Sequence, residues 1–237
     1  MIEAIIFDKD GTLIDFDSLW IPMTANVIGS ILKSFGREDI PYEEFLASVG
    51  VKNGVTDADG ILCKGTYKQI TTAFNEVLKR YKCPTIQEQL VIDTYNKCAD
   101  SGEIKPTCEN IREVLIKLKE CGIKLAIVTT DNAEITHKCL KKLEIVDLFD
   151  KVYTDDGKTP VKPDPYCALD FSDITGVGLD KILMVGDTMT DVYFAKNAGI
   201  SFVGVAMAPQ NRFYLNDCAD VVVPDISYIY EFIKEDK

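Results

Sequence analysis

Ala4-Ile5-Ile6-Phe7-Asp8-Lys9-Asp10-Gly11-Thr12 is the stretch that decides the fold of this 237-residue chain. Its apolar first half is typical of a strand that is buried on both faces, as the strands of a parallel sheet are. Two carboxylates, Asp8 and Asp10, follow where the strand is expected to end, and Gly11 permits a tight turn there. Because open α/β sheets bind ligands outside the carboxyl ends of their strands, the two acids are candidates for a functional site.

The second half of the chain alternates predicted strands with predicted helices. The predicted strands cover residues 124–129, 151–154, 182–186, 200–205 and 219–223, and the predicted helices cover 110–120, 132–143, 191–198 and 225–233. Strands that alternate with helices of this length indicate βαβ units and a parallel sheet. Right-handed crossovers then place helices on both faces, so we expect a doubly wound, Rossmann-like α/β core.

Residues 17–101 carry a different pattern. Apolar residues recur there at helical spacing, and no stretch resembles the buried strands of the second half. Turn-forming pairs, Asn53-Gly54 and Asp59-Gly60, lie between the helical stretches. We therefore expect residues 17–101 to form a small helical cap domain that is inserted after the first strand. Residues 1–16 and 102–237 would then form the core, with the cap above the carboxyl edge of its sheet.

Charge and cysteine content exclude several classes of protein. The net charge of -12 disfavours nucleic acids and anionic membrane surfaces as partners. The eight cysteines are scattered without a C-x-x-C pair, and one histidine is present, so no zinc ligand set is indicated. No run of 18 apolar residues and no leader segment is evident. We expect a cytoplasmic protein, monomeric or homodimeric, with reduced thiols.

Four groups of polar side chains follow predicted strands. In chain order they are Asp8 with Asp10, Thr129 with Thr130, Lys162, and Asp187 with Asp191. The carboxyl ends of parallel strands meet at one edge of the sheet, so these groups should converge. Carboxylates held together repel one another and favour a hard divalent cation, for which Mg²⁺ is the usual match. Such an ion keeps positions for water and a substrate phosphate, whose remaining oxygens the lysine and hydroxyls would hold.

This set of motifs resembles the haloacid dehalogenase-like superfamily, in particular its capped phosphatases similar to phosphoglycolate phosphatase. The resemblance rests first on the segment from Asp8 to Leu13, and second on Gly186-Asp187-Thr188-Met189-Thr190-Asp191. A helical insertion directly after the first motif matches the cap of that family in position. The resemblance covers residues 1–16 and about 102–237, together with the order of the core elements.

The resemblance implies covalent phosphoryl transfer to a small phosphate ester. Asp8 would be the nucleophile that forms an aspartyl-phosphate, and Asp10 would be the general acid and base. Mg²⁺ would be bound by Asp8, by the backbone carbonyl of Asp10 and by Asp187. Asp191 would lie next to these ligands without binding the ion directly. Thr129, Thr130 and Lys162 would bind the phosphate, and Lys162 would also offset the charge of Asp8. Because a halide needs no proton on leaving, Asp10 points to phosphate esters and away from dehalogenation.

Two positions depart from the pattern of the family. Asp131 follows Thr130 where a small residue or asparagine is more common, and we interpret it as the N-cap of the next helix, in a capping box with Glu134. Lys158 competes with Lys162 for the third motif, although Pro163 after Lys162 favours the latter.

Two other functions stay open on the sequence. A sugar phosphomutase similar to beta-phosphoglucomutase would use the same nucleophile and return the phosphoryl group to a sugar. A phosphorylatable regulatory domain would carry a magnesium-bound aspartate as a switch, although such domains are much shorter and would leave the insertion unexplained.

Overall fold

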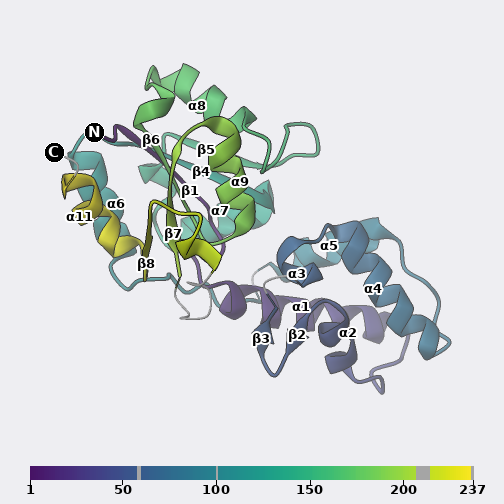
Figure 1. Ribbon diagram of the computed structural model, residues 1–237. Helices are drawn as coiled ribbons and strands as arrows, with labels where there is room; N and C mark the ends of the chain where they lie inside the picture. Colours follow the sequence, from purple (N-terminus) through teal and green to yellow (C-terminus); the bar gives the residue numbers. More distant parts are fainter. Residues whose placement is uncertain (58–59, 100, 207–213, 236–237) are drawn as a thin grey trace. The chain divides into compact units, whose positions relative to one another are not determined.

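The computed structural model describes residues 1–57, 60–99, 101–206 and 214–235 of the chain. The chain divides into two compact units (Figure 1). One consists of Met1–Asp15 with Pro106–Lys237, and the other of Phe16–Lys105. The second unit is therefore inserted into the first, directly after the first strand and the turn that follows it.

The larger unit is built on a six-stranded parallel sheet with the order β5-β4-β1-β6-β7-β8. Its strands are β1 (Ala4–Phe7), β4 (Lys124–Asn132), β5 (Lys151–Asp155), β6 (Ile182–Gly186), β7 (Ser201–Val205) and β8 (Val221–Val223). β1 lies between β4 and β6, and every residue of β1 and β6 is buried. Burial on both faces explains why these two strands are continuous apolar runs in the sequence.

Helices cover both faces of this sheet. They are α6 (Ile111–Glu120), α7 (Ala133–Lys142), α8 (Tyr166–Thr175), α9 (Met189–Ala198) and α11 (Ile229–Glu235), with short 3₁₀ turns η1 (Val146–Leu148), η2 (Leu179–Lys181) and η3 (Ile226–Tyr228). α8 and α9 share one hydrophobic cluster with Ala4 and Ile6. Ile5 and Phe7 point to the opposite face, where α6 packs against α11 (Figure 1). The expectation of a doubly wound α/β core with a helical insertion is confirmed.

The inserted unit is mainly helical. Its elements are α1 (Phe16–Ser34), α2 (Tyr42–Ser48), β2 (Val51–Lys52), β3 (Val55–Thr56), α3 (Ile61–Lys64), α4 (Tyr67–Arg80) and α5 (Glu88–Cys98). Trp20 and Tyr95 lie in its core with ring centroids 6.0 Å apart. β2 and β3 form a short antiparallel hairpin that the sequence predicted only as a turn. Asn53 and Gly54 form that turn with φ angles of 54° and 75°, which type I′ hairpin turns require.

Most core elements end close to their predicted limits, and three differ. β4 continues past residue 129 to Asn132 through an irregularity in its pairing with β5. The last predicted helix begins as the 3₁₀ turn η3 before it becomes α11. α8 was not among the predicted helices, because its buried residues Cys167, Ala168 and Phe171 give a weak amphipathic pattern.

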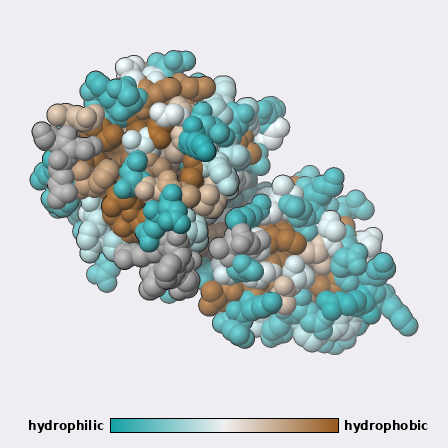
Figure 2. All heavy atoms as spheres, viewed as in Figure 1, coloured by the Kyte–Doolittle hydropathy of each residue, from teal (hydrophilic) through white to brown (hydrophobic). Residues whose placement is uncertain are grey.

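Hydrophobic and hydrophilic side chains are mixed on the surface of both units (Figure 2). The exposed apolar side chains include Leu169 and Ile174 of α8, and scattered residues of this kind are ordinary on globular proteins. Within the described ranges, no helix combines the length and the apolar character that a bilayer-spanning segment needs.

Candidate active site

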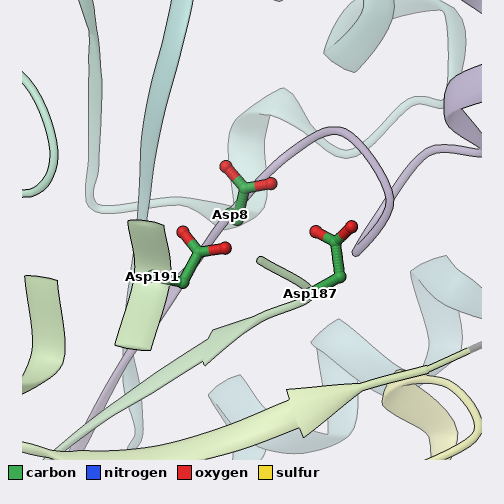
Figure 3. A group of neighbouring side chains, drawn as sticks. All are labelled: Asp8, Asp187 and Asp191. Carbon is green, nitrogen blue, oxygen red and sulfur yellow. The ribbon is translucent and has the colours of Figure 1, made fainter. Parts of the chain in front are cut away.

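Three carboxylates meet at the carboxyl edge of the sheet (Figure 3). Asp8 directly follows β1, and its N–H donates a hydrogen bond of 2.8 Å to the carbonyl of Val185 in β6. Asp187 directly follows β6, and Asp191 lies in the first turn of α9. One oxygen of each carboxylate lies within 4.8 Å of the other two. Adjacent parallel strands therefore bring together acids that are about 180 residues apart in the chain.

Lys162 joins two of these carboxylates. Its Nζ atom lies 2.5 Å from Oδ1 of Asp8 and 2.6 Å from Oδ1 of Asp191, and its side chain is 3% exposed. Lys158, by contrast, lies in an exposed turn in which its backbone N–H donates to Asp156. Of the two lysines considered for the third motif, Lys162 is the one that contacts Asp8.

Hydrogen bonds orient two of the acids. The hydroxyl of Thr12 donates to Oδ1 of Asp187 at 3.1 Å, and the hydroxyl of Tyr214 donates to the Asp187 carbonyl at 2.9 Å. The N–H and hydroxyl of Thr188 donate to Oδ2 of Asp191 at 3.0 and 2.7 Å. Thr12, Thr188 and Tyr214 are not among the predicted site residues. The Thr188-x-x-Asp191 spacing is a capping-box signal with aspartate in place of glutamate, whereas nothing local marks Tyr214.

The charges of this site are unbalanced in favour of a cation. Burial raises the pKa of Asp8 to about 7; Lys162 lowers it, and Asp191 and Asp10 add to the rise. Burial and the neighbouring Asp8 raise the pKa of Asp187 well above its usual value. Among the described residues, the ion pairs with this three-acid group come from one ammonium, that of Lys162. Because the donor set consists of carboxylate oxygens, its chemistry fits a hard divalent ion such as Mg²⁺.

Asp10 is held by Lys9. Its carboxylate is not part of the three-acid group, and both of its oxygens lie 2.8 Å from Nζ of Lys9. The backbone around it is fixed by a tight turn, in which the N–H of Gly11 donates to the carbonyl of Ile14 at 2.7 Å. Gly11 has a φ angle of 83°, which is strained for residues with a side chain.

The second motif differs in part from its prediction. Thr129 is buried and its hydroxyl accepts the N–H of Asp131 at 3.1 Å, whereas Thr130 is exposed. The prediction that Asp131 caps the next helix is wrong. Asn132 is the N-cap of α7, and its side chain accepts the N–H of Ile135 at 3.0 Å. β4 runs three residues further than predicted, to Asn132, and the cap of α7 falls one position later than predicted.

Asp131 is instead buried against Lys9. Oδ2 of Asp131 lies 3.0 Å from Nζ of Lys9, and the exposed fractions of the two side chains are 3% and 0%. Burial raises the pKa of Asp131 to about 6, against the lowering effect of Lys9. Burial by itself would lower the pKa of Lys9, but Asp10 and Asp131 raise it well above its usual value. Lys9 is therefore a buried ammonium that contacts two carboxylates.

Comparison with known proteins places this arrangement in a family. The sequence profile of the haloacid dehalogenase-like hydrolases matches residues 5–205. A phosphoglycolate phosphatase from Psychrobacter arcticus is 28% identical over 207 residues, which cover 86% of this chain and 83% of the relative. A pyrophosphatase PpaX from Halalkalibacterium halodurans is 29% identical over 214 residues, 90% of this chain and 88% of the relative.

A solved structure has the same fold. The crystal structure of a predicted phosphoglycolate phosphatase from Haemophilus somnus superposes with a TM-score of 0.72 and covers 98% of each chain, at 20% identity.

Proposed function

This chain belongs to the haloacid dehalogenase-like hydrolase family, and we propose that it is a Mg²⁺-dependent phosphatase acting on small phosphate monoesters. The family membership confirms the expectation of an enzyme. One observation supports the proposal of a Mg²⁺-dependent phosphatase: the Asp8 carboxylate lies beside the Lys162 ammonium and within 4.8 Å of Asp187 and Asp191. A nucleophile, a cationic phosphate ligand and a hard-metal site coincide there.

In the first step, a carboxylate oxygen of Asp8 attacks phosphorus and the bond between phosphorus and the ester oxygen breaks. Asp10 gives its proton to the departing oxygen, so that an alcohol leaves. Lys162 has its ammonium next to Asp8, where it would also hold a phosphate oxygen. The hydroxyl of Thr129 would hold another.

In the second step, a water molecule attacks phosphorus of the aspartyl-phosphate. Asp10 now takes the proton of that water, the bond between phosphorus and Asp8 breaks, and inorganic phosphate leaves. Asp8, Asp187 and the Asp10 carbonyl would hold Mg²⁺, with Asp191 kept in place by Thr188 and Lys162. The bound ion would neutralise phosphate charge, and positioning with electrostatic stabilisation would supply most of the rate enhancement.

The proposed substrate class is a small phosphorylated metabolite. The two curated relatives are a phosphoglycolate phosphatase and a pyrophosphatase, so 2-phosphoglycolate and pyrophosphate are the first compounds to test. The inserted unit would select among such substrates, since it is the part of the chain outside the α/β core.

The test is a phosphate-release screen over small phosphorylated metabolites with Mg²⁺. Asp8→Asn should abolish release while its melting temperature stays within a few degrees of the parent protein, and a chelator should abolish release reversibly. Asp39→Asn is the matched control. Asp39 is 65% exposed and forms an ion pair with Arg37, and both residues are distant in the sequence from every motif. Undiminished activity of Asp8→Asn would refute the covalent mechanism.

The same screen separates the alternatives. A sugar phosphomutase would interconvert sugar phosphates in the presence of a bisphosphate and release little phosphate. A regulatory domain would hold a long-lived phosphate on Asp8 without turnover.

A further inference from the structure

Lys9 is a buried charge for which the proposed mechanism has no use. Its side chain is 0% exposed although it stands between the two acids of the first motif. A buried ammonium is costly unless charged or polar partners compensate it. Lys9 has two such partners in Asp10 and Asp131, and we call these three residues the Lys9 cluster.

The geometry of the Lys9 cluster fixes Asp10. Nζ of Lys9 lies 2.8 Å from both oxygens of the Asp10 carboxylate, so rotation about either side-chain torsion of Asp10 would weaken a contact. The backbone on both sides is already held, because the N–H groups of Leu13 and Ile14 donate to the Lys9 carbonyl at 2.9 and 3.0 Å. Lys9 therefore restricts the remaining freedom of Asp10, which is rotation of its side chain.

Asp131 has a separate part in the Lys9 cluster. It reaches Lys9 from β4, and its own side chain is 3% exposed, whereas that of Asp10 is 14% exposed. Asp10 is therefore the member of the cluster that reaches outward. Because Asp131 already compensates the ammonium, Asp10 can accept a hydrogen bond with one oxygen whether or not its other oxygen carries a proton. A general acid and base must exist in both states during one turnover.

We propose that Lys9 is a positioning residue, which aims the Asp10 carboxylate at the leaving oxygen, and that Asp131 is the fixed counter-charge of Lys9. This inference rests on the proposed phosphatase function and adds two residues to its machinery. It also accounts for the acid at position 131, because Asp131 points to Lys9 and does not act as a helix cap.

The alternative is that Lys9 only compensates Asp131 inside the fold. Lys9→Met alone cannot separate the two roles, since it leaves Asp131 buried without a counter-charge and would destabilise the protein. The double variant Lys9→Met with Asp131→Asn removes both charges and keeps the size of both side chains. It should fold with a melting temperature close to that of the parent protein.

The experiment compares kcat/KM of the double variant for an alkyl phosphate and for 4-nitrophenyl phosphate. Nitrophenolate leaves readily without a proton, whereas an alkoxide depends on the general acid. We expect kcat/KM to fall about 100-fold for the alkyl ester and to change little for the aryl ester. Equal effects on the two esters, or no effect on either, would overturn the proposal.

A crystal structure of the double variant gives a readout that does not need activity. The Asp10 carboxylate should leave its position by about 1 Å or more, the scale at which catalysis is lost. An unmoved Asp10 would overturn the positioning role even if no substrate were hydrolysed. Failure of the phosphatase proposal looks different, because the parent protein itself would then release no phosphate.

Discussion

Replacing Gly11 with alanine should disable the site through a collision with Asp187. A Cβ atom on Gly11 would lie 2.1 Å from Oδ2 of Asp187, whereas ordinary contacts begin at 3.4 Å. The carboxylate would therefore move by about 1.3 Å, a displacement on the scale that costs about 100-fold in rate. This movement would break the hydrogen bond that Oδ1 of Asp187 accepts from Thr12.

The same substitution also strains the backbone. Gly11 has a φ angle of 83°, and an alanine in the left-handed region costs roughly 1–2 kcal/mol. For a chain of this length, each kcal/mol lowers the melting temperature by about 2–4 °C. The strain alone therefore predicts a loss of roughly 2–8 °C.

Gly122→Ala is the matched control. Gly122 has a φ angle of 82°, but a Cβ atom there would meet nothing within 4 Å. Both variants should lose similar stability by thermal denaturation. Gly11→Ala alone should lose about 100-fold in kcat/KM and bind Mg²⁺ at least about tenfold more weakly by calorimetry. If the two variants kept the same activity and the same Mg²⁺ affinity, the collision with Asp187 would not affect function and the reasoning would be refuted.

Three further predictions concern Lys162, Mg²⁺ binding and the cap of α7. Lys162→Met leaves the buried carboxylates of Asp8 and Asp191 without their ammonium. The free energy of unfolding, measured with denaturant at pH 8, should therefore fall by about 3–5 kcal/mol. An unchanged denaturation midpoint would contradict this prediction. Mg²⁺ should raise the melting temperature more at pH 8 than at pH 5.5, because Asp8, with a pKa of about 7, must lose its proton to bind the ion; equal shifts at both pH values would argue against Asp8 as a ligand. Asn132→Ala removes the side chain that accepts the N–H of Ile135 and should cost about 1 kcal/mol. The control is Lys141→Ala, because Lys141 is an exposed residue of the same helix.

Patterns with strong local causes were readable from the sequence. The strand at 182–186 is observed with the predicted limits, because a continuous apolar run of this length is too short for a helix and suits a buried strand. The hairpin β2–β3 and the short helices α2 and α3 were not predicted as such. Segments of two to seven residues carry too few apolar positions to define a period, and contacts within the inserted unit decide their form.

The placement of Asp131 shows where local reasoning failed. Its distance from Glu134 suits a helix cap, and a cap is a local interaction that sequence spacing can indicate. Its actual partner, Lys9, is 122 positions earlier in the chain. The pairing of β1 with β4 brings the two residues together, and no spacing along the sequence reports such a contact.

By itself, the sequence determined the parallel α/β core, the existence of an insertion after the first strand, and the residue types at the carboxyl edge. These follow from hydrophobic period and from the positions of strand ends, which are properties of short segments. Only the tertiary structure decided the partners that the sequence left open: Asp191 for Lys162, the Asp187 carbonyl for Tyr214, and Lys9 for Asp131. Charge pairing and burial act through space, so they depend on which strands lie side by side.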